Sequence, residues 1–145
     1  MEDEFAGKSR EDFLTTVVVM WEMLRELCSR FPIPVGLPEL LVDAPASVQE
    51  ACAAVQRARD ELLPAQSLPA TTEALIAEGA LEMLHALLMV QHTDVFGFTE
   101  WHAELWFRCL ERVRFMCVRT TGSLKLMARE ERDRFPGTGE PPEQE

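Results

Sequence analysis

Apolar residues recur at every third or fourth position over four long stretches of this chain. Prolines lie between the first three stretches, and Gly97 lies between the last two. This spacing places the apolar side chains along one face of an α-helix. Proline ends a helix because it has no amide proton and its ring clashes with the preceding turn. We therefore predict an all-α fold, a compact bundle of four main helices with one or two short helices. The main helices are expected over residues 9–31, 45–63, 73–91 and 100–121.

The fourth helix and the residues after it carry the most detailed expectations. Its core side is expected to present apolar residues in steps of three and four, namely Trp101, Leu105, Cys109, Val113 and Met116. Gly122 is expected to cap its C-terminus, and a short helix should follow. A chain of 145 residues suits one domain, so residues 1–134 should form a single helical domain. Residues 135–145 are acidic and rich in proline, and they should form a disordered tail.

The charge of the chain is negative overall but unevenly distributed. The 25 acidic and 14 basic residues give a net charge of −11, which argues against a dedicated binder of nucleic acids or anionic membranes. Residues 1–107 carry 6 bases and 18 acids, whereas residues 108–134 carry 8 bases and 4 acids. The basic segment is expected to dock an acidic partner, to pair with the acidic helices of the same molecule, or to remain a solvated face.

The sequence also predicts the compartment. Its first residues lack the basic and apolar pattern of a secretory signal. The longest stretches without a charged side chain have 11 residues, and a spanning helix needs about 20 apolar residues. We therefore expect a cytoplasmic or nuclear protein without a membrane span. The four cysteines have no Cys-x-x-Cys spacing and should be buried free thiols. The absence of Asn and Tyr is typical of a GC-rich coding region, such as that of a large DNA virus.

Motifs of catalysis and metal binding are incomplete in this sequence. Glu82 and His85 form a Glu-x-x-His pair, but di-iron helical bundles use two such pairs and the chain has only one. Cys109 or Cys117 could meet His85 or His102 in space, but no nucleophile motif surrounds them. Glycine-rich phosphate loops are absent. We therefore expect no enzymatic activity, no bound metal and no cofactor.

Aromatic and arginine side chains gather in the fourth helix and the turn before it. Tryptophan and arginine often anchor protein interfaces. We therefore predict a non-enzymatic regulatory protein that binds another protein through an aromatic surface rimmed by arginines. A homodimer is the alternative assembly. The expected contact residues are Phe98, Trp106, Phe107, Arg108, Arg112 and Arg119.

One segment of the second helix is similar to a known binding motif. Residues 55–62 read Val-Gln-Arg-Ala-Arg-Asp-Glu-Leu and resemble the BH3 segment of Bcl-2 family proteins, an amphipathic helix with spaced apolar anchors and an aspartate. The resemblance implies anchors at Val55, Ala58 and Leu62, with Asp60 as the acid. Arg59 stands where the family has a small residue, and the family's Asn-Trp-Gly-Arg motif is absent. The resemblance implies a regulator of apoptosis as the alternative function.

Overall fold

The computed structural model describes the backbone of residues 2–134 and the side chains of residues 10–134. This part of the chain contains four α-helices and no strand, so the all-α prediction is confirmed. The helices are α1 (Glu2–Ser29), α2 (Pro45–Arg57), α3 (Ala70–Phe96) and α4 (Glu100–Arg134). Two short helices follow α2, the π-helical η1 (Ala58–Leu62) and the 3₁₀-helical η2 (Pro64–Gln66). The predicted tail at residues 135–145 lies outside the described residues.

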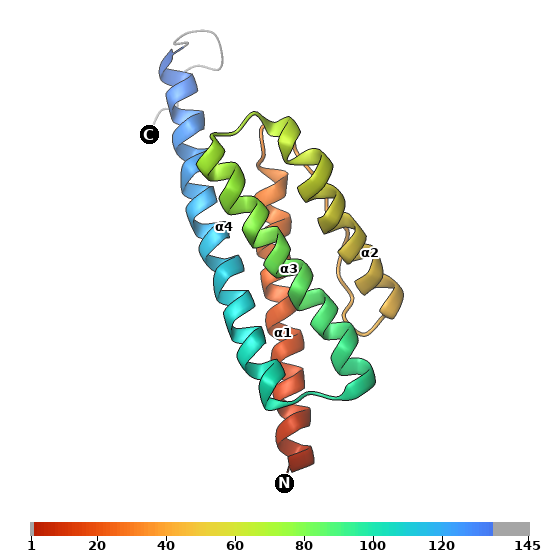
Figure 1. Cartoon of the computed structure of the whole chain (residues 1–145). Coiled ribbons are helices and arrows are strands. Elements are labelled where there is room, and N and C mark those ends of the chain that lie inside the picture. Colours follow the sequence, from red (N-terminus) through yellow and green to blue (C-terminus); the bar gives the residue numbers. More distant parts are fainter. Residues whose placement is uncertain (1, 135–145) are drawn as a thin grey trace, which may run out of the picture.

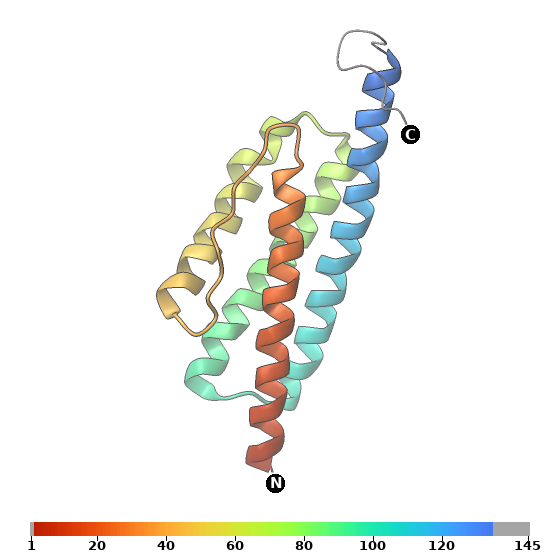
Figure 2. The same cartoon turned by 180° about the vertical axis from the view of Figure 1, so that it is seen from behind.

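The helices form an elongated bundle with one long crossover connection. Helices α1, α2 and α4 run in the same direction, and α3 runs in the opposite direction between them (Figure 1). The connector of residues 30–44 returns along the bundle from the end of α1 to the start of α2 (Figure 2). Helix α3 contacts the other three helices. Its apolar side chains point in nearly every direction, which is why the sequence predicts it at the centre of the bundle.

The long connector is packed on the bundle and held by side-chain hydrogen bonds. It buries four apolar side chains, Phe31, Val35, Leu37 and Leu40. The indole nitrogen of Trp21 donates to the carbonyl of Pro38 at 2.9 Å. The buried amide of Gln66 accepts from the backbone nitrogen of Ile33 at 2.8 Å and donates to its carbonyl at 2.9 Å. These bonds replace water, because buried backbone groups need partners.

The core lies between the four helices, and its innermost side chains are fully buried. These include Phe13, Val17, Trp21, Met83, Leu87, Val113 and Met116. Helices α3 and α4 pack close together at Gly79, where an added Cβ would lie 2.5 Å from Cε of Met116. Glycine is required there because a larger residue would occupy the space that Met116 fills.

The structure corrects the expected helix ends. Helix α1 begins at Glu2, before the expected start at residue 9. Helix α3 continues to Phe96 and ends at Gly97, whose φ of 83° only glycine adopts easily. Helix α4 continues through Gly122, so this glycine does not cap it. The continuation has a physical reason: Leu124 and Met127 extend the apolar stripe and pack against the core. No helix in the described part of the chain combines the length and the apolar character that crossing a membrane requires.

Candidate protein-binding surface

Helix α4 has one side in the core and a second side exposed to solvent. We call the exposed side the outer face of α4; it consists of Trp101, Glu104, Phe107, Arg108, Glu111, Phe115, Val118, Arg119 and Leu126. Seven residues make slightly less than two helical turns, so Trp101, Arg108 and Phe115 lie nearly in line. Trp101 is 77% exposed, Phe107 64% and Phe115 56%. Large apolar side chains that stay exposed along one side of a helix are candidate contacts for a partner.

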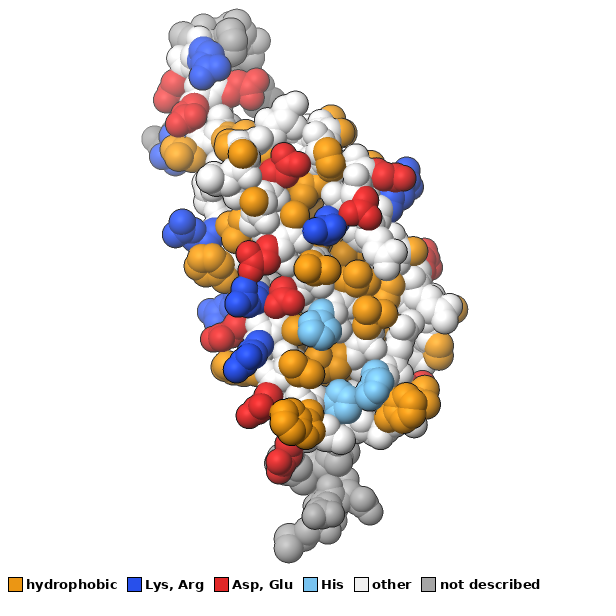
Figure 3. All heavy atoms as spheres, viewed as in Figure 1, with side chains coloured by type: hydrophobic (Ala, Val, Ile, Leu, Met, Phe, Trp, Pro, Cys, Tyr) orange, Lys and Arg blue, Asp and Glu red, His pale blue; other side chains and the backbone are white. Residues whose placement is uncertain are grey.

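Arginines alternate with the aromatic side chains on this face. Basic and apolar side chains lie together along the edge that α4 forms (Figure 3). The guanidinium carbon of Arg119 lies 5.7 Å from the ring centre of Phe115, within the range of a cation–π contact. A shallow depression in the same region is lined by Arg108, Glu111, Arg112, Arg114, Phe115 and Val118. In the described part of the chain, no acidic side chain forms an ion pair with Arg108, Arg114 or Arg119.

The six expected contact residues have different surroundings in the structure. Phe107, Arg108 and Arg119 lie on the outer face. Arg112 is exposed but pairs with Glu78 and Glu82 of α3, and its Nε lies 3.5 Å from Oε2 of Glu82. The charge pattern left open that arginines of the basic segment pair with acidic helices of the same molecule. Arg112 forms such a pair.

The other two expected contact residues face inward. Phe98 is only 8% exposed. Trp106 is half-buried, and its ring packs against Phe13 and Phe98 at centroid distances of 5.6 and 6.0 Å. These two side chains support the first turns of α4 from inside the bundle. Their large aromatic side chains made them candidates in the sequence, but the turn at residues 97–99 directs Phe98 into the core.

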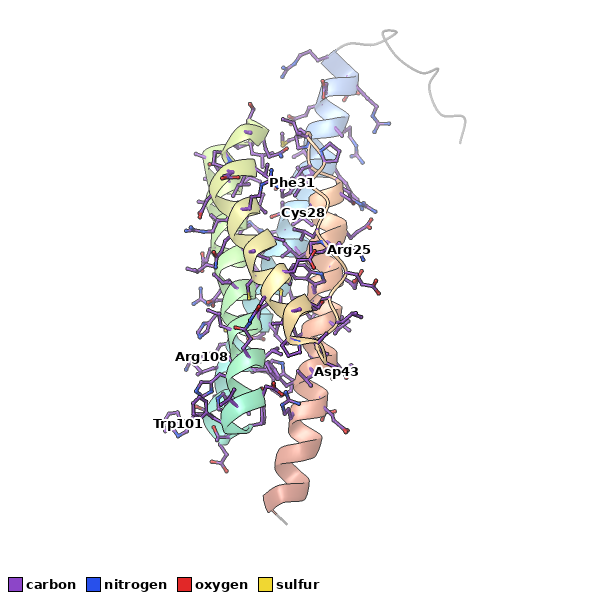
Figure 4. The ribbon with its side chains drawn as sticks, turned by 90° about the vertical axis from the view of Figure 1, so that its right-hand side faces the viewer. Arg25, Cys28, Phe31, Asp43, Trp101 and Arg108 are labelled. Carbon is purple, nitrogen blue, oxygen red and sulfur yellow. The ribbon has the colours of Figure 1, made fainter. Side chains whose placement is uncertain are left out.

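Trp101, Phe115 and Val118 belong to the outer face but were not among the expected contact residues. The expected core side of α4 was wrong at Trp101 and at Leu105, which is 41% exposed. The reason is that His102 and Trp106 occupy the inward positions of the first turns. Trp101 projects away from the helices at the margin of the molecule, and Arg108 lies further along the same edge (Figure 4). The seven-residue spacing from Arg108 is the sequence signal that would have found Trp101 and Phe115.

A histidine pair fixes the start of α4. The backbone nitrogen of Thr99 donates to Nδ1 of His102 at 3.0 Å. Because this nitrogen of His102 accepts, the neutral ring carries its proton on Nε2, which lies 2.9 Å from Nδ1 of His92 on α3. Burial, and then the nearby His92, lower the pKa of His102 below its usual 6.5. The contact joins the end of α3 to the first turn of α4, beside Trp101.

The structure also places the residues of the incomplete catalytic and metal motifs. Cys109 of α4 meets His85 of the Glu82–His85 pair, with Sγ 3.4 Å from Nδ1. His102 contacts His92 and Thr99 instead of a cysteine. Burial, together with the charge of Glu82, raises the pKa of the Cys109 thiol to about 11, although Arg112 acts in the opposite direction. A thiol with this pKa is a weak nucleophile near neutral pH.

The BH3-like segment lies at the end of α2. Val55 is buried in the core, and Ala58 and Leu62 pack against it. Residues 58–62 are π-helical, and Asp60 pairs with Arg59 at 3.2 Å. The three implied anchors therefore face this molecule's own core, and the structure does not present them to a partner.

Comparison of the chain with models of protein families, with curated proteins and with solved structures found no match. The function must therefore be inferred from the residues and geometry described above. The fold does not explain the apolar side chains and arginines on the outer face of α4.

Proposed function

We propose that this protein binds another protein through the outer face of α4, and that the partner's surface is apolar and acidic. One observation carries the proposal: large apolar side chains and arginines alternate along a helix that needs neither on that side for folding. The binding would be regulatory and non-enzymatic.

The apolar side chains would supply most of the binding free energy. Trp101, Phe107 and Phe115 keep more than half of their surface exposed. Fully burying a large apolar side chain contributes roughly 1.5–3 kcal/mol. Aromatic anchors at the centre of an interface often cost about 2 kcal/mol or more when they are truncated. Phe115 lies near the middle of the face, so its loss should weaken binding by at least about tenfold.

The arginines would select an acidic partner and accelerate association. Residues 108–125 carry five basic side chains and one acidic side chain, whereas the chain as a whole has a net charge of −11. Complementary charge raises association rates and disfavours partners of the same charge. Arg119 already lies over Phe115, so part of the basic rim is ordered before binding. The partner should therefore present carboxylates around an apolar centre.

Site-specific cross-linking in the native cell tests this proposal. A photoreactive phenylalanine analogue would replace Phe115, and a control analogue would replace Val19, an α1 residue of similar exposure. We expect an acidic protein to be cross-linked from position 115 and not from position 19. Equal capture from both positions, or no capture from position 115, would contradict the proposal. Capture of a second copy of the chain would contradict binding to another protein and would indicate a homodimer.

Charge reversal then tests the acidic character of the purified partner. The double variant Arg108→Glu/Arg119→Glu should weaken binding at least about tenfold. The matched control Arg30→Glu/Arg57→Glu changes the net charge equally, at exposed positions just after α1 and at the end of α2. It should change the affinity by less than about twofold, because long-range effects of surface charge are screened by salt. An equal loss of affinity in both double variants would show that binding depends only on the net charge of the chain, and it would refute docking on α4.

A further inference from the structure

Three potential metal ligands meet where α3 and α4 pack together, beside the outer face of α4. Glu82 and His85 are one turn apart on α3, and Cys109 approaches them from α4. One carboxylate oxygen, one imidazole nitrogen and the thiol sulfur all lie within 4.8 Å of one another. The imidazole Nδ1 is 3.4 Å from the sulfur and 3.7 Å from Oε1 of Glu82.

Two of these separations, from Nδ1 of His85 to the sulfur and to Oε1 of Glu82, lie close to the edges of a tetrahedral zinc site. Zinc binds thiolate sulfur at about 2.3 Å and imidazole nitrogen or carboxylate oxygen at about 2.0–2.2 Å. Two ligands at the tetrahedral angle are then roughly 3.3–3.6 Å apart. The distances from Nδ1 of His85 to its two neighbours are close to this range, so a cation could be held with small side-chain rotations.

The surroundings of the cluster also suit a bound cation. Cys109 is buried and its position is fixed by the packing of α4, whereas the side chain of His85 is 49% exposed. The exposed side gives an ion a path of entry and leaves a fourth coordination position open to water. The second carboxylate oxygen of Glu82 faces Arg112. That contact orients the carboxylate so that Oε1 points toward His85, as supporting residues do around metal sites.

We propose that Glu82, His85 and Cys109 form a zinc-binding site that links α3 to α4. A thiolate and an imidazole favour zinc over magnesium or calcium, which prefer oxygen ligands. Sequence spacing does not reveal the site, because the chain has no second Glu-x-x-His pair and the third ligand is a cysteine 24 residues from His85. Such a site would stabilise the folded chain, because it joins two helices only in the native state.

Metal titration of the full-length protein, first freed of metal with a chelator, tests the proposal. We expect one Zn²⁺ per chain by calorimetry and a melting temperature roughly 5–10 °C higher when the metal is in hundredfold excess over its dissociation constant. Cobalt in place of zinc should give the near-ultraviolet absorption of a sulfur-to-cobalt charge transfer. Absence of stoichiometric binding, or cobalt binding without this absorption, would overturn the proposal.

Variants locate the site. His85→Gln removes an exposed ligand and should weaken zinc binding at least about tenfold without loss of helical circular dichroism. Cys109→Ser should abolish the cobalt–sulfur absorption. The matched controls are His92→Gln, an exposed histidine near the end of the same helix, and Cys52→Ser, a buried cysteine of α2. Both controls should bind zinc like the unmodified protein. Binding that survives His85→Gln and is lost in His92→Gln would place the metal on the histidine pair and refute the assignment.

Discussion

Replacing Gly79 with alanine tests the close packing of α3 on α4. The added Cβ would lie 2.5, 2.6 and 2.8 Å from Cε, Cγ and Cβ of Met116. Carbon atoms in favourable contact are about 3.5–4.0 Å apart, so each contact is too short by roughly 1 Å. Met116 is fully buried, and its Cβ is fixed to the backbone, so rotation of the side chain cannot relieve the whole clash. The two helices would have to separate.

Two opposing effects set the magnitude. Overpacking of a core costs about 1–3 kcal/mol, and alanine is favoured over glycine within a helix by about 1 kcal/mol. Because the clash includes Cβ of Met116, we expect the upper part of the overpacking range. The free energy of unfolding should therefore fall by about 1–2 kcal/mol. Urea denaturation followed by circular dichroism measures this change.

Gly122→Ala is the matched control for Gly79→Ala. Gly122 lies inside α4, and no atom is within 4 Å of the position of its added Cβ. This variant gains the same helical preference without a clash, so its stability should rise by about 0.5–1 kcal/mol. The difference between the two variants in the change of the free energy of unfolding measures the cost of the clash with Met116. If Gly79→Ala is as stable as Gly122→Ala, the account of α3–α4 packing is wrong. If Gly122→Ala is destabilised, α4 does not continue through this residue.

Three further predictions concern single buried groups. The pKa of His102 is lower in the folded chain than in the unfolded chain, so the unfolded chain takes up the proton first as the pH falls. The free energy of unfolding should therefore decrease below about pH 6.5. Denaturation of His102→Gln across this range should show a smaller slope of the free energy of unfolding against pH. Thr120→Val should raise the free energy of unfolding by about 1 kcal/mol, because the buried Thr120 hydroxyl has no hydrogen-bond partner among the described residues; a loss of stability would contradict this. Burial raises the pKa values of the Cys28 and Cys117 thiols to about 12, so iodoacetamide should alkylate them near neutral pH only after denaturation, as mass spectrometry would detect.

The period of the apolar residues predicted the helices because burial of one face decides where helices form. The same period predicted the helix ends poorly, because a helix ends where its contacts with the rest of the fold end, and the apolar period carries no information on those contacts. Gly122 has the residue type of a helix cap, but contacts of Leu124 and Met127 with the core keep α4 helical beyond it. The turn at Gly97 was expected, but α3 extends through residues 92–96 before reaching it.

The candidate surface was predictable in part. Charge counting located the basic side of α4 because arginine occurs there without matching acids. The prediction that Trp101 belongs to the core side of α4 was wrong. Trp101 fits the apolar period, but it lies outside the core because His102 fills the neighbouring inward position. The contact of Cys109 with His85 could not be placed by spacing alone, because it depends on how far α4 is shifted along α3.

The central claim is that the outer face of α4 binds an apolar, acidic surface of another protein. The most direct test is the dissociation constant of the cross-linked partner, purified, for the unmodified chain and for Phe115→Ser, with equal helical content shown by circular dichroism. The account predicts binding at least about tenfold weaker for the variant. Equal dissociation constants for the two chains would contradict it.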